Sequence, residues 1–471
     1  MKVLIVHYHL KPGGVTTVIR RQLSVLATMG VDAAVMTGDS PGGFGGTVSV
    51  EPALAYDSAY NAGSRLGNDA DRVAAIATAI GRAADALGED TIIHVHNPTI
   101  RKNSSMLPAL SELASRGRRL VLHVHDLAED WRPDVYSKEA YPDGVLWVAI
   151  NRFDAESLRK AGAGSVVYLP NAVPCPPELM RSASEGSITK GPGLVLCPVR
   201  GIRRKNLGEA ILLSMFMRDG SRLGVTLPPS SPRDMPFYQG WKDTAARKLL
   251  PIAFGLGLDS GLDELYAQSI AVLTTSIKEG FGMSFMEPAT RGRVTLGRRL
   301  PRVVADFEQD GLHFPALYDA IVVPRGLFDE SAFAQRVQLV VDKALVAYRR
   351  SIHGFSASIV DSILDVSGPG PDFGRLDEPA QVQVLDSLGA TSAARADILK
   401  ANPFLDAWDS AAENLEPPRR DELEPWSEAV YGTRLKELYD NALRDGGGAA
   451  PDKDRLLSMY LRPEAFHGVG I

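Results

Sequence analysis

The sequence has few of the features that mark secreted, redox-active or membrane-spanning proteins. Its 471 residues include only two cysteines, Cys175 and Cys197, and these do not form a CxxC pair. Two thiols are too few for a disulfide framework and fit a reducing compartment. No window approaches the roughly 18–20 apolar residues of a membrane-spanning helix, and the apolar run in MKVLIVHYHL is far shorter than a signal peptide. We therefore expect a cytoplasmic protein without a transmembrane segment.

An excess of positive charge is also lacking. The net charge is −6 and the pI is about 5.9, which argues against broad nucleic-acid binding, so no nucleic-acid partner is expected. The sequence contains neither a Walker A loop nor a GxGxxG fingerprint, so a dinucleotide-dependent dehydrogenase is the least favoured enzyme class. The length exceeds that of a typical single core and predicts two domains.

Short apolar runs alternate with amphipathic helical stretches. KVLIVHYH is apolar on both faces, as a strand of a buried parallel sheet should be, and VTTVIRRQLSVLATMG has apolar residues at helical spacing. Further strands are predicted in DAAVMTG, TIIHVHN, RLVLHVHD, LWVAIN and VVYLPN, and later in GLVLCPVR, RLGVTLP, PIAFGLG and IAVLTTS. This βαβ rhythm predicts an α/β fold of two Rossmann-like, doubly wound domains that face a central cleft.

The rhythm also suggests the domain bounds. The proline-rich LPNAVPCPPE and the following SASEGSITKGPG are interpreted as a linker. We expect an N-terminal domain at 1–172 and a C-terminal domain at 173–425, with a helical insertion from about 331 that begins with DESAFAQRVQLVVDKALVAYRR. A C-terminal helix and tail, 426–471, are expected to cross back to the first domain.

The stretch SIKEGFGMSFMEPA combines two carboxylates with a glycine-rich turn. A buried strand is predicted to end near Ser276 and a helix to begin near Met283, which places Glu279 in the turn and Glu287 one turn into the helix. Gly280 and Gly282 allow close approach of a ligand, and the free N–H groups at the helix start attract phosphate. Two glutamates alone could equally complement the helix dipole and face solvent.

Two other loops could meet an anion. In VRGIRRKNLGEA, Arg200 and Lys205 flank a turn after a strand and could neutralise a diphosphate, whereas Arg203 and Arg204 are interpreted as solvated. In LKPGGVTT, Gly13 and Gly14 lead into a helix start.

Six of the nine histidines form HxH pairs, namely His7/His9, His94/His96 and His123/His125. The members of each pair point to the same face of a strand. Zinc would accept such ligands, but hydrogen-bonding residues around a cleft, with some members packed beneath it, are the ordinary interpretation, so no metal is expected.

With these motifs the chain resembles the retaining glycosyltransferases of family four, which have the GT-B fold. The resemblance rests on KPGGV, IIHVHN, LHVHD, LPNAV, VRGIRRKN, LDELYAQS, EGFGMSFMEPA and WSEAVYGTRLKELYD, over about residues 1–310 and 426–440. It implies hexosyl transfer, with retention and without a cofactor, from a UDP-, GDP- or ADP-linked sugar to a hydroxyl of a small soluble or lipid-linked acceptor.

The resemblance also implies roles for individual residues. Glu279 would hold the donor sugar and Glu287 the ribose, while Arg200 and Lys205 would stabilise the leaving diphosphate. The same resemblance implies donor-side or acceptor-side roles for the other residues of these loops. Donor-binding candidates are Gly14, Gly280, Phe281, Gly282, Met283 and Ser284; His125 would lie near the reaction centre; acceptor-side candidates are Gly13, His96, Asn97 and Asp126.

The sequence departs from that family in several places. The arginine-rich TRGRVTLGRRLPRVVADFEQDGL replaces the usual small-residue helix and strand, RLGVTLPPSSPRD lacks a glycine-rich ending, and HFPALYDAIVVP and the stretch from about 331 to 425 have no counterpart. A GT-B nucleotide-sugar epimerase and a non-catalytic GT-B-like binding protein are the alternative functions.

Overall fold

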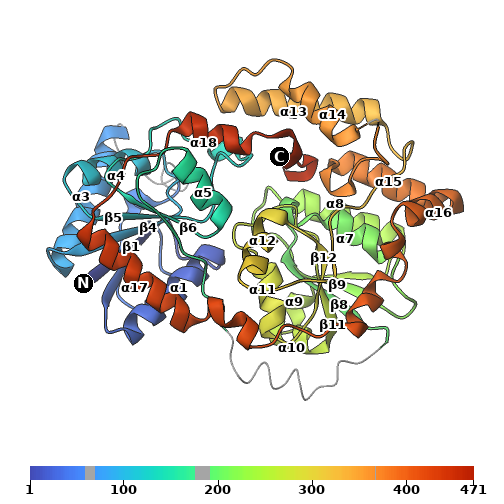
Figure 1. Cartoon of the computed structure of the whole chain (residues 1–471), viewed down its shortest axis with the longest axis horizontal. Coiled ribbons are helices and arrows are strands. Elements are labelled where there is room, and N and C mark those ends of the chain that lie inside the picture. The colour runs from blue at the N-terminus through green and yellow to red at the C-terminus, as the bar shows by residue number, and fades with distance from the viewer. Residues whose placement is uncertain (59–68, 175–190, 366, 471) are drawn as a thin grey trace. The chain divides into compact units, whose positions relative to one another are not determined.

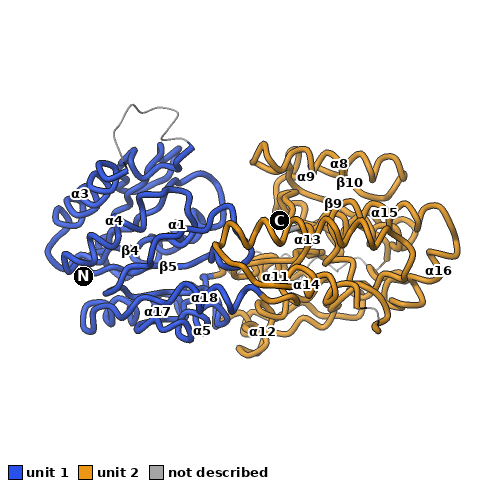
Figure 2. Tube along the Cα trace, turned by 90° about the horizontal axis from the view of Figure 1, so that it is seen from above, with its two compact units in different colours: residues 1–172, 425–461 blue, residues 173–424, 462–471 orange. Residues whose placement is uncertain are grey.

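The structure, a computed structural model, describes residues 1–58, 69–174, 191–365 and 367–470. The chain divides into two compact units (Figure 2). Unit 1 comprises Met1–Ala172 and Pro425–Leu461, and unit 2 comprises Val173–Glu424 and Arg462–Ile471. The segment 426–471, treated as one piece above, is thus shared between the units. The linker prediction falls largely on residues outside those described, as does Cys175.

Unit 1 contains a parallel sheet of seven strands in the order β3-β2-β1-β4-β5-β6-β7 (Figure 1). The strands are β1 (Lys2–His7), β2 (Asp32–Thr37), β3 (Val48–Val50), β4 (Thr91–His96), β5 (Leu120–Val124), β6 (Leu146–Ala149) and β7 (Val166–Tyr168). Strand β1 pairs with both β2 and β4, so the direction of winding reverses between β1 and β4. The loops after these two strands leave the sheet at its carboxyl edge, where α/β proteins bind ligands.

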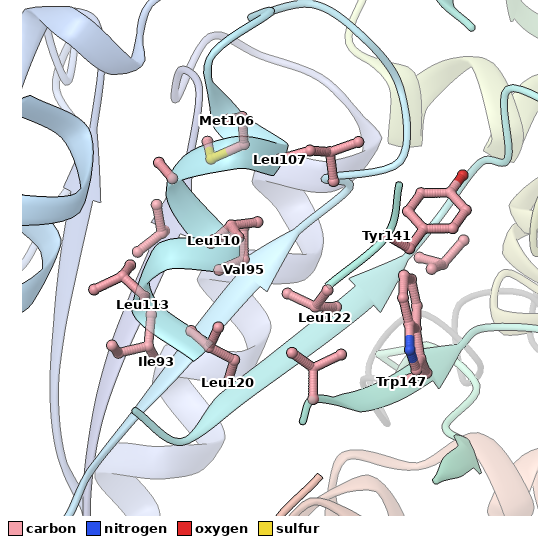
Figure 3. Close-up of a cluster of buried hydrophobic side chains, with 14 of the residues drawn as sticks. Ile93, Val95, Met106, Leu107, Leu110, Leu113, Leu120, Leu122, Tyr141 and Trp147 are labelled. Carbon is pink, nitrogen blue, oxygen red and sulfur yellow. The ribbon is translucent and has the colours of Figure 1, made fainter. Parts of the chain in front are cut away.

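Helices cover both faces of this sheet. They are α1 (Gly14–Thr28), α3 (Asp69–Leu87), α4 (Met106–Ser115), α5 (Arg152–Lys160), α17 (Glu428–Arg444) and α18 (Lys453–Tyr460). Alternate residues of β1 enter two cores: Leu4 and Val6 pack in the core with α3, α4, α5 and α18, and Val3 and Ile5 pack in the core with α1 and α17. Figure 3 shows side chains of α4 over β4 and β5 in the first core. Burial on both faces explains the continuous apolar runs of these strands.

Unit 2 repeats this topology in a parallel sheet of six strands, β10-β9-β8-β11-β12-β13. The strands are β8 (Leu194–Arg200), β9 (Arg222–Leu227), β10 (Ile252–Phe254), β11 (Ser269–Thr274), β12 (Thr295–Arg298) and β13 (Leu317–Tyr318). The helices between them are α7 (Leu207–Ser214), α8 (Met235–Arg247), α9 (Leu256–Asp259), α10 (Leu262–Gln268), α11 (Met283–Thr290) and α12 (Pro301–Gln309). Here the winding reverses between β8 and β11.

A helical segment follows the sheet of unit 2. Its helices are α13 (Glu330–Ala347), α14 (Phe355–Leu364), α15 (Glu378–Ala390) and α16 (Ser392–Ala401). The predicted helix in DESAFAQRVQLVVDKALVAYRR corresponds to α13, which Asp329 caps by accepting the N–H of Ala332 at 2.9 Å. Among the described residues, no helix combines the length and hydropathy needed to cross a membrane.

The arginine-rich stretch after α11 is a structural element of the sheet. Residues Thr295–Arg298 form β12, which pairs with β11. Gly297 has φ +128°, and an added Cβ would lie 2.0 Å from the carbonyl oxygen of Thr274, so only glycine allows this close approach. Arg293 is buried and donates to the carbonyl oxygens of Tyr266 and Ala267, both at 2.9 Å. This strand lacks the usual apolar pattern because arginines occupy buried positions.

Candidate functional site

Two loops meet at the point where the winding of unit 2 reverses. One loop follows β8 and contains Lys205, and the other follows β11 and contains Glu279. The Ile277 N–H donates to the carbonyl oxygen of Arg204 at 3.0 Å, and the Thr275 hydroxyl donates to that of Lys205 at 2.8 Å. The backbone of one loop is thereby tied to the other at the carboxyl edge of the sheet.

The side chains of Lys205 and Glu279 form an ion pair between these loops. Both are largely buried, with side-chain exposures of 13% and 8%. The Arg204 guanidinium contacts the other carboxylate oxygen of Glu279 at 2.9 Å, and the Ser276 hydroxyl donates to Glu279 at 2.8 Å. The interpretation of Arg204 as a merely solvated residue was therefore wrong, because a partner distant in sequence holds it.

The two cations determine the ionisation of Glu279. Burial alone would raise the pKa of this carboxyl, but the charges of Lys205 and Arg204 outweigh burial and lower the pKa from 4.5 to about 2. Burial also lowers the pKa of Lys205, against the opposing effect of Glu279. We take the pair as ionised near neutral pH, because the carboxylate has two cationic partners. An ionised Glu279 is an acceptor for hydroxyl groups.

Helix α11 begins directly after this loop. Its N-cap, Gly282, has φ +91°, and an added Cβ would lie 2.4 Å from Cγ1 of Val303. Phe281 is buried and packs edge-on against Phe307, with ring centroids 5.6 Å apart. Met283 and Ser284 are the first helical residues, and the first N–H groups of an α-helix have no acceptor within the helix.

The remaining glutamate of the motif, Glu287, lies one turn into α11 and is half-buried. Its charge adds to burial in raising the pKa of Tyr266, which places the carboxylate near the α10 side of the helix. Glu279 thus lies in the loop before α11 and Glu287 on the helix itself, as the sequence predicts.

Other basic residues of the first loop have separate partners. Arg200, at the end of β8, is exposed and donates a hydrogen bond to the Ser230 hydroxyl. Arg203 contacts Asp234 at 3.1 Å and lies over the ring of Phe237 at 5.2 Å. Lys205 and Arg204, rather than Arg200, are the cations that contact Glu279.

Unit 1 has a second polar cluster, made of histidines at the carboxyl ends of β4 and β5. His94, His96, His123 and His125 are all buried. His94 Nε2 lies 3.1 Å from His123 Nδ1, and His96 Nδ1 lies 2.9 Å from His125 Nε2. Burial lowers the pKa of His125 to about 4, with Asp126 opposing the shift. The cluster is therefore neutral near pH 7, and it is the hydrogen-bonding network that the HxH pairs predict.

Gln22 from α1 determines which nitrogen atoms carry protons. Its Nε2 donates to the Tyr439 hydroxyl at 2.7 Å, so its Oε1, 2.9 Å from His96 Nε2, accepts a hydrogen bond. A neutral His96 protonated on Nε2 then accepts through Nδ1 from His125 Nε2. These bonds leave Nδ1 of His125 as a hydrogen-bond acceptor.

Three of these histidines are close enough together to be possible zinc ligands. His94, His96 and His123 each offer a nitrogen atom, and these atoms lie within 4.8 Å of one another. However, the rings of His94 and His96 are stacked with centroids 4.7 Å apart and planes 6° apart. An ion bound to an imidazole nitrogen lies near the plane of the ring, so one ion cannot serve both rings in this arrangement.

The other unit 1 candidates lie in the loops after β4 and β5 and at the start of α1. Asn97 has φ +56°, and its Oδ1 accepts the backbone N–H groups of His125 and Asp126 at 3.3 and 3.1 Å. Gly13 and Gly14 lie at the start of α1 and are exposed. An added Cβ at Gly14 would meet no atom within 4 Å, so the protein's own packing does not require glycine there.

In sequence, the chain matches a known protein over part of its length. No family model matches the sequence. The chain is 27% identical over 341 residues to mannosylglucosyl-3-phosphoglycerate synthase of Petrotoga mobilis, and the match covers 64% of this chain and 66%, just under two thirds, of that protein.

Solved structures show the fold. A glycosyltransferase from Rickettsia africae has a TM-score of 0.50 at 15% identity and covers 94% of this chain and 99% of its own. TarM has a TM-score of 0.50 at 9% identity and covers 93% and 98%. With its two Rossmann-like parallel-sheet units, the chain has the GT-B fold.

Proposed function

We propose that the protein is a retaining glycosyltransferase that moves a hexosyl group from a nucleoside diphosphate sugar to an acceptor hydroxyl. The observation that carries this proposal is the buried Lys205–Glu279 pair beside the start of α11. A cation, a carboxylate and a helix N-terminus are the groups needed to bind a sugar joined to a diphosphate. The GT-B fold and the partial match to a sugar-transferring synthase support the same function.

The proposed chemistry assigns the unit 2 residues to the donor. Lys205, with Arg200 and the N–H groups of Gly280–Ser284, would hold the diphosphate. We include Arg204 in this set because it contacts Glu279 beside Lys205. Negative charge grows on the leaving diphosphate as the glycosidic bond breaks, and fixed cations stabilise it. Glu279 would accept hydroxyls of the sugar, and Glu287 those of the ribose. The proposal assigns no step to a metal ion.

Unit 1 would supply the acceptor side. Gly13, His96, Asn97 and Asp126 lie in or beside the loops after β1, β4 and β5, and the buried network presents Nδ1 of His125 as an acceptor for a hydroxyl. Gly14, at the start of α1, would instead lie under the phosphates of the donor. The name of the Petrotoga relative denotes a small phosphorylated glycoside as its product. We therefore favour a small soluble acceptor over a lipid-linked one.

A thermal-shift panel of UDP-, GDP- and ADP-linked sugars tests the proposal. The cognate donor should raise the melting temperature, since ligands that bind the native state stabilise it. Glu279→Gln should bind the nucleoside diphosphate but lose transfer to acceptors. If no nucleotide sugar raises the melting temperature, the enzyme assignment is wrong. Conversion of the donor to another nucleotide sugar without acceptor would instead identify an epimerase.

A further inference from the structure

The residue after Lys205 has an unusual backbone conformation. Asn206 has φ +47° and ψ +59°, in the left-handed region, and is fully buried. A residue other than glycine is strained there, although asparagine tolerates the region better than most. The conformation therefore persists because surrounding groups hold it.

Two hydrogen bonds hold the Asn206 side chain. Its Nδ2 donates to Oε2 of Glu209 at 2.8 Å, and its Oδ1 accepts from Nε2 of Gln381 at 3.0 Å. Glu209 is in α7, whereas Gln381 is in α15, about 175 residues further along the chain. An added Cβ at Gly208 would lie 2.2 Å from Gln381 Oε1, so the two helices are in close contact at this point.

Glu209 is fully buried and lies at the centre of a hydrogen-bond network. It accepts from Arg298 Nε at 2.8 Å and Nη2 at 2.7 Å, from the Tyr318 hydroxyl at 2.7 Å, and from Asn206. Four donors fill the acceptor positions of an ionised carboxylate. Glu209 has no exposed surface, so the loss of any of these donors would leave part of a buried charge unsatisfied.

Arg298 connects this network to the helical segment. The Nη1 and Nη2 edge of its guanidinium forms a bidentate pair with Asp372, at 2.7 and 2.8 Å. Asp372 also accepts the backbone N–H groups of Ile321 and Gly374 at 3.0 and 3.2 Å. The path from Asp372 through Arg298 and Glu209 thus ends at Asn206, next to Lys205.

We propose that the helical segment from about 330 to 415 holds the loop that bears Lys205 in the geometry that binds diphosphate, with Gln381 and Asp372 as positioning residues. The proposal rests on the donor-binding role of Lys205 proposed above. It gives a function to the segment that has no counterpart in the sequence resemblance. The buried charged groups Glu209 and Arg298, with the largely buried Asp372, link that segment to the proposed site, although charged groups cost free energy to bury.

Gln381→Met tests this role, because it keeps the length of the side chain and removes the bond to Asn206, together with a bond to the carbonyl oxygen of Phe373 at 3.1 Å. We expect the affinity for the best binder among UDP, GDP and ADP to fall about tenfold, as for a group displaced by a fraction of an ångström. The variant could bind less nucleotide because part of it is unfolded or because the site has changed its geometry. Isothermal titration calorimetry separates these effects, since the stoichiometry reports the folded fraction and the affinity reports the geometry of the site.

Asn402→Leu is the matched control. Asn402 is a buried amide of the same segment, and it bonds the backbone of Val322 in both directions at 2.7 Å. Its loss should lower the melting temperature without changing nucleotide affinity. If Gln381→Met binds nucleotide like the unmodified protein, or if Asn402→Leu weakens binding equally, the bond from Gln381 to Asn206 does not position the loop and the proposal is wrong.

Asn206→Gly provides a second test if Gln381→Met does not fold. Glycine adopts the left-handed conformation without strain, so this variant loses the two side-chain bonds while keeping the backbone geometry available. We expect it to weaken nucleotide binding as well, and unchanged affinity would overturn the proposal. If the unmodified protein binds none of the three nucleotides, the proposed function is refuted, and this inference with it.

Discussion

Replacing Glu279 by glutamine should change how the stability of the protein depends on pH. The pKa of this carboxyl is lowered from 4.5 to about 2, and each unit corresponds to about 1.4 kcal/mol. The ionised form therefore contributes about 3 kcal/mol to the free energy of unfolding. Because the pKa is lowered in the folded state, this contribution is fully present well above pH 4.5 and is lost as the pH falls toward 2.

Urea denaturation of the unmodified protein and of Glu279→Gln, at pH 7 and pH 3.5, measures this contribution. At pH 7 the variant should be less stable by about 3 kcal/mol, and the gap should narrow by about 1 kcal/mol at pH 3.5. Glu264→Gln, at an exposed position of the same unit, is the control and should follow the unmodified protein. A gap that is absent, or that does not change with pH, would refute the assignment of Glu279 as an ionised partner of Lys205 and Arg204.

Three further variants test other parts of the structure. Gly282→Ala should destabilise the protein by about 1–3 kcal/mol, because φ is +91° and the new Cβ would clash with Val303. Urea denaturation measures this loss, and an unchanged stability would contradict the geometry of the α11 cap. Tyr439→Phe should cost about 1–2 kcal/mol in the same assay, because the buried Gln22 amide and Nδ1 of His94 each lose a hydrogen bond to this hydroxyl. Tyr431→Phe should cost little, because that hydroxyl has no hydrogen-bond partner within the described residues. Lys205→Met should weaken nucleoside diphosphate binding at least about tenfold by calorimetry, and unchanged binding would remove Lys205 from the donor site.

The larger elements of the fold could be predicted from periodicity. The run KVLIVHYH is apolar on both faces because β1 is a central strand covered by helices on each side. Short or edge strands gave weaker signals. Strands β3 and β13 contain only three and two residues, and β12 ends in Arg298, whose burial depends on acidic partners distant in sequence.

The candidate site was predictable only as far as local spacing determines it. The order strand, glycine turn, helix placed Glu279 in a loop and Glu287 on α11, as the structure shows. The partner of Glu279 could not be inferred in the same way, because Arg204 and Lys205 reach it through the pairing of β8 with β11. The network from Asp372 to Asn206 was likewise missed, since its members are far apart in the sequence and each resembles an ordinary surface residue.

The return of the chain to unit 1 has a consequence for biosynthesis. Helix α17 contributes Tyr431, Leu435 and Tyr439 to one core of the first sheet, and α18 contributes Leu456 and Tyr460 to the other. A nascent chain that has emerged only as far as residue 424 therefore presents a sheet with incomplete apolar cover on both faces. Domains usually fold in the order in which they leave the ribosome. Here the domain that starts first is completed only after most of the second domain has been made, and a stop codon before α17 would leave its interior open to water.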